Sequence, residues 1–116
     1  MARGVLLVQS DPRSGREGDF DQFYDRVHIP EILETPGFRR GRRLRAVRSD
    51  RLPHRPEGEW RSNLAIYDVV SDDLIGAYAG LIDRMTQGSL TSSDVFSDVN
   101  PYRAQLFEEV FEAVPR

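Results

Sequence analysis

The chain has 116 residues, of which 39% are apolar and 30% charged, and its net charge is −3. This length and composition predict one globular domain spanning residues 1–116 and exclude disorder along most of the chain. The sequence contains no cysteine, which excludes disulfides, thiolate catalysis and cysteine-ligated metals, and the acidic balance argues against nucleic-acid binding.

No segment of the sequence predicts contact with a membrane. No apolar run approaches the ~20 residues that cross a bilayer. The apolar residues at 5–8 are too few for the core of a signal peptide. Together with the absence of cysteine, these features predict a cytoplasmic location.

The first part of the chain predicts a strand followed by a helix. Residues 4–10 form a short apolar run that ends in turn residues, as a buried central strand does, and residues 11–18 are typical of a loop. Residues 19–34 predict a helix, with Asp19 as its N-cap and acidic residues in its first turn.

The predicted helix has an apolar stripe and an internal proline. The apolar residues at 20, 23, 24 and 27 follow the spacing i, i+3, i+4, i+7, so one face of the helix is apolar. Pro30 lacks a backbone donor, and its ring clashes with the carbonyl four residues back. We therefore expect the regular helix to end or kink near His28, with a short second turn after it.

The remaining elements follow from alternation and turn residues. In order, we expect a strand at 38–49, a loop at 51–59, a strand at 60–70, a helix from Ser71 or Asp72 to about residue 87, a loop at 88–101 and a strand at 102–113.

The order β-α-β-β-α-β is that of the split βαβ or ferredoxin-like unit, an α+β fold. Right-handed crossovers give the strand order 4-1-3-2 and place both helices on one face of the antiparallel sheet. The other face stays bare, although at least the first and third strands bring apolar residues to it. Because nothing else in the chain is left to cover that face, we predict a homodimer.

The distribution of charge supports this prediction. All sixteen basic residues are arginine, and six of them lie on the second predicted strand, whereas acidic residues lie on the fourth. These strands are opposite edges of the sheet, so their charges would pair only across a two-fold axis. The alternative is a solvated charged edge that prevents aggregation. The residues are Arg39, Arg40, Arg42, Arg43, Arg45 and Arg48 against Glu108, Glu109 and Glu112.

One block of sequence resembles a known family. The residues at 23–31 (FYDRVHIPE), followed by Leu33 and by the TPGF at 35–38, are similar to the signature of EthD-like proteins in the dimeric α+β barrel superfamily. Later stretches, at 85–94 and 102–108, are also similar to such sequences. The resemblance covers about residues 4–110, and its first block is the specific part.

The resemblance implies a dimeric barrel with a pocket between helices and sheet in each protomer. Relatives in the superfamily include cofactor-free monooxygenases, polyketide cyclases, haem-degrading enzymes, muconolactone isomerases and proteins without assigned activity. The resemblance therefore indicates a fold more sharply than a function.

His28 is the main catalytic candidate. It lies one turn after Tyr24 on the apolar stripe, and an imidazole is the side chain best suited to move a proton at neutral pH. Asp25 is placed to hold one ring nitrogen and fix the tautomer, and Tyr24 to stabilise an oxyanion. The alternative is a half-buried structural histidine without a substrate role.

Six further residues are candidates for substrate binding. Tyrosines at the rim of a core would hydrogen-bond a carbonyl, an arginine would bind an anionic or phenolic group, and a carboxylate in a loop would act as a lid or base. The alternative for each of them is a purely structural role, as a core residue, a member of an ion pair, a turn residue or a packing residue. They are Phe20, Arg43, Trp60, Tyr67, Tyr78 and Asp94.

Other site types are weakly supported. Two histidines 26 positions apart, without cysteine, do not supply the ligands of a zinc site. Haem would have to use His28 as its axial ligand, and neither a phosphate-binding loop nor a nucleophile elbow is present. We expect no metal and no cofactor.

The sequence thus predicts a cofactor-independent enzyme of secondary metabolism that acts on a small hydrophobic substrate, aromatic or polyketide-like. His28 would transfer a proton next to a carbonyl, as in a cyclase, isomerase, decarboxylase or cofactor-free monooxygenase. The alternative is a non-catalytic small-molecule-binding or accessory protein of the same fold.

Overall fold

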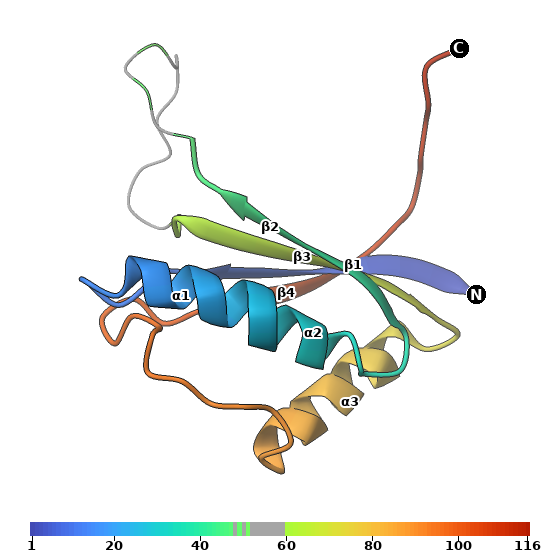
Figure 1. Ribbon diagram of the computed structural model, residues 1–116. Helices are drawn as coiled ribbons and strands as arrows, with labels where there is room; N and C mark the ends of the chain where they lie inside the picture. Colours follow the sequence, from blue (N-terminus) through green and yellow to red (C-terminus); the bar gives the residue numbers. More distant parts are fainter. Residues whose placement is uncertain (48, 50, 52–59) are drawn as a thin grey trace.

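The structure is a computed structural model that describes residues 1–47, 49, 51 and 60–116. A four-stranded antiparallel sheet in the order β2-β3-β1-β4 has the helices on one face (Figure 1). This confirms the predicted ferredoxin-like α+β topology. The elements are β1 (Ala2–Ser10), α1 (Glu17–Phe23), the π-helix η1 (Tyr24–His28), α2 (Ile29–Ile32), β2 (Phe38–Arg45), β3 (Asn63–Ser71), α3 (Leu74–Thr86) and β4 (Arg103–Glu108).

The core lies between the sheet and the helices. Leu6 at the centre of β1 pairs with Tyr67 of β3 on one side and with Leu106 of β4 on the other. Leu6 and Tyr67 are almost completely buried, and Leu106 packs against them. Side chains alternate between the two faces of a strand, so every second residue of each strand faces the helices. The core is therefore a single layer of side chains between the sheet and the helices.

The first helix is continuous but changes its winding. It begins at Glu17, so the prediction that Asp19 is the N-cap is wrong; Arg16 takes that position without a side-chain cap. The chain then passes through the π-turn of η1 directly into α2. Pro30 explains the change, because the wider turn relieves the clash between its ring and the carbonyl of Arg26. The predicted irregularity near His28 is confirmed.

Four of the predicted boundaries are wrong. The strand predicted at 60–70 begins at Asn63, and the one predicted at 102–113 ends at Glu108, because the residues beyond it have no neighbouring strand to pair with. The second helix is capped by Asp73, whose carboxylate accepts a hydrogen bond from the Gly76 amide at 2.9 Å. Ser71 instead ends β3. Of the strand predicted at 38–49, β2 ends at Arg45, and Arg48 lies outside the described residues.

One glycine lets the first helix lie close to the sheet. A Cβ atom at Gly41 of β2 would stand 2.8 Å from Cγ2 of Ile29 and 3.3 Å from the ring of Tyr67. Any other residue would push α2 away from the sheet. Gly41 therefore allows the short distance between the sheet and the segment that follows the π-turn.

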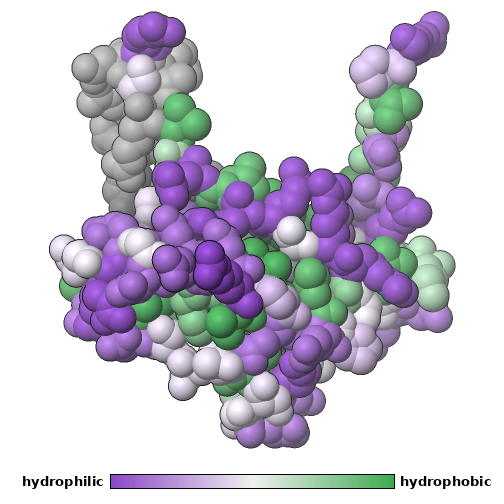
Figure 2. Space-filling view, in the orientation of Figure 1, coloured by the Kyte–Doolittle hydropathy of each residue, from purple (hydrophilic) through white to green (hydrophobic). Residues whose placement is uncertain are grey.

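The opposite face of the sheet is uncovered in this protomer. The strands present Val5, Leu7 and Ile66 to it, all half-buried, together with the exposed Phe107 and several arginines. Apolar and hydrophilic atoms are interspersed along this side, the upper one in Figure 2. Within the described residues, no helix is long and apolar enough to span a membrane.

Candidate functional site

A cavity of about 410 Å³ lies between the sheet and the helices. We call it the central cavity. None of its lining side chains is an aspartate, glutamate or arginine. The lining comprises Leu6 and Val8 of β1, Ala104 of β4, Tyr24, His28 and Ile32 of the first helix, Tyr78, Leu81, Ile82, Met85 and Thr86 of α3, and Phe96 and Tyr102 of the segment between α3 and β4.

His28 lies at the end of the π-turn, inside an aromatic cluster. Its ring centroid is 5.0 Å from that of Tyr24, 5.6 Å from that of Phe23 and 5.8 Å from that of Phe96. Its Nδ1 atom is buried and has no hydrogen-bond partner among the described residues. Burial lowers the pKa of His28 below its ordinary 6.5, against a smaller opposing effect of the Glu31 carboxylate. The imidazole is therefore neutral at pH 7 and able to accept a proton.

This lowered pKa links His28 to stability at acid pH. Below pH 6.5 the unfolded chain protonates this imidazole while the folded chain does not, so the free energy of unfolding falls as the pH drops. We expect urea denaturation to show a larger loss of stability between pH 7.5 and 5.5 in the wild type than in His28→Gln. An equal loss in both proteins would contradict a buried, neutral His28. The wild type and His28→Gln have all their other titrating groups in common, so the contributions of those groups to the pH dependence cancel in the comparison.

Two tyrosine hydroxyls on this side of the sheet are also buried, that of Tyr24 on the cavity wall and that of Tyr67 in the core behind it. Tyr24 and Tyr67 are fully buried, and neither hydroxyl meets hydrogen-bond geometry with another described residue. They lie close enough to affect one another, and burial raises the pKa of both phenols. Both are therefore protonated at neutral pH and available as hydrogen-bond donors.

Asp25 does not orient His28, contrary to the sequence-based expectation. Its carboxylate forms a bidentate ion pair with Arg43, with Oδ1 2.7 Å from Nε and Oδ2 3.0 Å from Nη2. The guanidinium lowers the pKa of Asp25. The reason is geometric: Asp25 is one residue after Tyr24 and so faces strand β2, away from the cavity.

Arg43 is likewise not a substrate ligand in this arrangement, since it does not line the central cavity. Besides Asp25, it reaches Asp21 at 3.0 Å and the side-chain oxygen of Asn63 at 3.1 Å. Asn63 in turn donates to the hydroxyl of Ser10, and the guanidinium carbon lies 6.0 Å from the centre of the Tyr24 ring. Arg43 therefore supports Tyr24 from behind.

Replacing Arg43 by alanine is expected to lower the free energy of unfolding by about 2 kcal/mol, because the side-chain oxygen of the buried Asn63 loses the donor that Arg43 supplies. The side chain of Arg43 is only 15% exposed. Arg45→Ala is the matched control: Arg45 also pairs with Asp21 but is 70% exposed, so a change below about 0.5 kcal/mol is expected. Equal effects in urea titrations would show that burial does not distinguish the two arginines.

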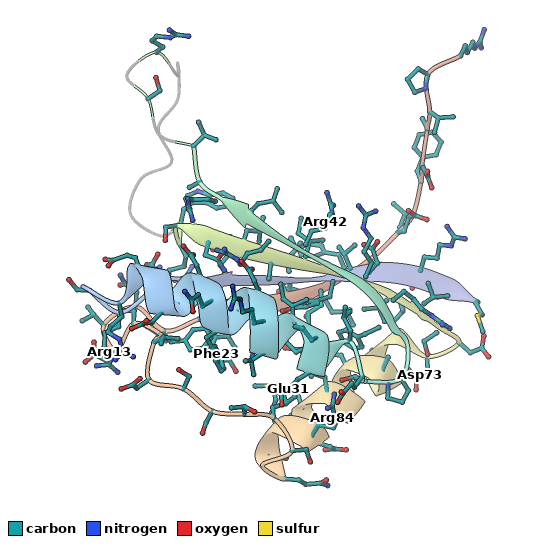
Figure 3. All side chains as sticks on the ribbon, in the orientation of Figure 1. Arg13, Phe23, Glu31, Arg42, Asp73 and Arg84 are labelled. Carbon is teal, nitrogen blue, oxygen red and sulfur yellow. The ribbon has the colours of Figure 1, made fainter. Side chains whose placement is uncertain are left out.

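The loop between α3 and β4 is tied down at two points. The Glu31 carboxylate accepts hydrogen bonds from the amide and hydroxyl of Thr91, both at 3.0 Å. Arg84 donates to the Glu31 carbonyl at 2.8 Å, and the two side chains lie close together in Figure 3. At the other end, Arg13 binds the carbonyl of Asp94. These ties hold Phe96 against the first helix.

The remaining candidates are divided between the cavity and other places. Tyr78 lines the cavity, whereas Phe20 and Tyr67 are core residues behind it. Trp60 is 60% exposed and precedes β3, and Asp94 pairs with Arg16 at 3.3 Å on the surface. Neither of these two residues lines the cavity.

Sequence reasoning missed several of the lining residues. Phe96 comes from the polar loop predicted at 88–101, and Tyr102 stands at the start of the strand predicted at 102–113; the aromatic character of each was the only available signal. Ile82 and Met85 continue the apolar face of α3 to its end. In the described residues no three or more histidine, aspartate or glutamate side chains cluster as metal ligands.

Comparison with known proteins gives one informative match. No protein-family model matches the chain, and no curated protein sequence matches it significantly. Among solved structures, the crystal structure of an EthD family protein from Bacillus halodurans C-125 is similar, with 20% sequence identity and a TM-score of 0.50. The match covers 95% of this chain and 100% of that protein. The chain has an EthD-like fold. At 20% identity the match shows a shared fold and no shared function. It agrees with the fold that the motif at 23–38 implies.

Proposed function

We propose that the central cavity binds a small, uncharged hydrophobic molecule, aromatic or polyketide-like, and that His28 transfers a proton next to its carbonyl group. The observation that supports this most is a neutral imidazole, with its pKa lowered by burial, at the wall of a cavity without acidic or arginine side chains. Such a cavity excludes charged ligands, because they would lose hydration without gaining a partner. A neutral imidazole is the form that accepts a proton.

The proposed chemistry needs a base and a hydrogen-bond donor. His28 removes a proton from the carbon next to the carbonyl, and the negative charge moves to the carbonyl oxygen. A protonated tyrosine, Tyr78 or Tyr24, stabilises that oxygen. The resulting enolate can attack a second carbonyl to close a ring, take up a proton at another carbon or react with oxygen, so a cyclase, an isomerase and a cofactor-free monooxygenase share this first step. A decarboxylase would reach the same enolate by loss of carbon dioxide, and the enolate would then take up a proton.

A non-catalytic binding or accessory protein is the second candidate. It is favoured by the lack of a hydrogen-bond partner for Nδ1 of His28 among the described residues, since Asp25 is held by Arg43. Histidines that act as bases usually have their second nitrogen held by a hydrogen bond. In this candidate the same cavity holds a ligand without converting it.

The two candidates are separated by one screen. The protein is mixed with uncharged aromatic ketones and linear polyketide mimics, with and without oxygen, and products are followed by mass spectrometry. Binding is followed in parallel through NMR shifts of Ala104 and His28. Conversion that depends on the protein supports the enzyme, and binding without conversion supports the accessory protein. Neither binding nor conversion, or a haem absorption band in the purified protein, would overturn the proposal of a cofactor-free site.

We also propose that the protein is a homodimer in the cytoplasm, in which a second copy covers the bare sheet face. The apolar residues on that face and the exposed Phe107 support this, since a sheet with one uncovered apolar face needs a second layer. Sedimentation at micromolar concentration tests it, and a monomer at every concentration would contradict it.

A further inference from the structure

Only some of the polar side chains that line the central cavity are free to donate a hydrogen bond to a ligand. The hydroxyl of Thr86 already donates to the carbonyl of Asp83, at 3.1 Å. The hydroxyl of Tyr24 is buried by its neighbours, so a ligand in the cavity cannot reach it without displacing them. The polar lining residues are Tyr24, His28, Tyr78, Thr86 and Tyr102.

His28 accepts a proton in the proposed reaction and therefore does not serve as the donor. Its Nδ1 atom is buried, which leaves Nε2 as the nitrogen that a ligand can contact. A nitrogen that takes up a proton carries no hydrogen before the reaction. The carbonyl oxygen of the ligand must find its hydrogen-bond donor elsewhere, and the hydroxyls of Tyr78 and Tyr102 are the ones that remain.

These two hydroxyls come from different elements and lie near each other. Tyr78 belongs to α3, whereas Tyr102 stands two residues before Ala104 and so faces the same side of the sheet. Neither hydroxyl forms a hydrogen bond with another residue in the part of the chain that the structure describes. Burial raises the pKa of Tyr78, and the nearby phenol of Tyr102 adds to this rise. Tyr78 is therefore protonated at pH 7 and can donate.

The two tyrosines stand where the cavity opens. Tyr102 is 57% exposed, and Ile82 and Met85 are 42% and 41% exposed, whereas Leu6 and Leu81 are almost completely buried. The three exposed residues mark the mouth of the cavity, formed by α3 and by the segment that leads from its end to β4 (Figure 1). A concave apolar site with a few polar groups that converge at one end is typical of small-molecule binding.

We propose that Tyr78 and Tyr102 together bind the carbonyl oxygen of the cavity ligand, each donating one hydrogen bond from its hydroxyl. Two donors on one oxygen form an oxyanion site, which stabilises the charge of an enolate more than it stabilises a neutral carbonyl. The ligand is then an aryl ketone or a related compound whose carbonyl lies toward the mouth and whose apolar body lies deeper. The inference rests on the function proposed above, and it assigns the oxyanion to this pair instead of Tyr24.

The first test measures how variants bind two probes of nearly the same shape. Acetophenone has a carbonyl oxygen, and α-methylstyrene has a methylene group in its place. Tyr78→Phe and Tyr102→Phe are each expected to weaken the binding of acetophenone by ~5-fold, the value of one hydrogen bond, and to leave that of α-methylstyrene within ~2-fold. NMR titration measures both affinities. Tyr67→Phe is the control, because Tyr67 loses the same oxygen but lies in the core behind the cavity.

The results of this test separate the inference from the proposed function. If Tyr78→Phe and Tyr102→Phe weaken both probes equally, or neither probe, the pair does not bind the oxygen, and the cavity still stands as the ligand site. If Tyr24→Phe lowers the preference for acetophenone and these two variants do not, Tyr24 is the donor and the inference is wrong. Failure of both probes to bind the wild type would overturn the proposed cavity function and the inference with it.

The carbonyl stretching band of bound acetophenone provides a second measurement. Hydrogen bonds to the carbonyl oxygen move this band to lower frequency, so isotope-edited infrared spectra of the wild-type complex should place it below its position in hexane. Each single variant should reverse part of the shift, and the double variant carrying Tyr78→Phe and Tyr102→Phe should reverse nearly all of it. A loss of packing alone would weaken binding without this reversal. A band that keeps its wild-type position in the double variant would contradict the proposed contact.

Discussion

Replacing His28 by asparagine is expected to lower turnover of the substrate found in the screen by roughly 10²–10⁴-fold, the usual contribution of a general base. The fold should persist, because His28 makes ring contacts but no hydrogen bond through Nδ1 among the described residues. Initial rates and the circular dichroism spectrum measure the two parts of this prediction.

The control for this variant is Asp25→Asn. Asp25 binds Arg43 rather than His28, so we expect turnover to fall by less than ~5-fold, with only a small loss of stability because the pair is largely solvent-exposed on the Asp25 side. If Asp25→Asn were as damaging as His28→Asn, the carboxylate would be orienting the imidazole in the working enzyme. A fully active His28→Asn would leave the binding protein as the better candidate.

Filling the central cavity is expected to have the second large effect, and it applies to both candidate functions. Ala104 lies on β4 with its side chain toward the cavity. Ala104→Trp should place an indole where the ligand binds and weaken ligand affinity by more than ~100-fold, because contacts and volume are lost together. The cost in stability should stay below the ~3 kcal/mol typical of overpacking, since the new side chain enters empty space.

Titration calorimetry with the best ligand of the screen measures this effect. Ala79→Trp is the control, since Ala79 is exposed on α3 and does not line the cavity. If Ala104→Trp bound the ligand as tightly as the wild type does, the ligand would have to bind outside the central cavity. The result would then argue against the cavity as the site of either function.

The topology was accessible to sequence reasoning because it follows from local patterns. Most of the strands and both long helices have a distinct apolar pattern, β2 with its arginines being the exception, and the order of elements leaves one right-handed arrangement. The irregularity near His28 was also accessible, since Pro30 forbids a regular turn there. The place of His28 beside Tyr24 on the cavity wall follows from the same spacing.

The partners of the polar side chains were not accessible in this way. Spacing along a helix places Asp25 near His28 in sequence, but strand β2 offers Arg43 at closer range and with two hydrogen bonds. The contribution of Phe96 depends on tertiary ties such as that between Glu31 and Thr91. Such contacts join residues far apart in the chain and leave no periodic trace.

The π-turn constrains the length of its segment as well as its composition. One residue advances a helix by about 100°, and a π-turn accommodates one residue more than an α-turn would. That extra residue resets the helical phase between Tyr24 and Ile32, so that both point inward although the proline separates them. An insertion or deletion here would rotate the downstream half of the helix and expose Ile32. Most single substitutions in the same turn would leave that phase unchanged.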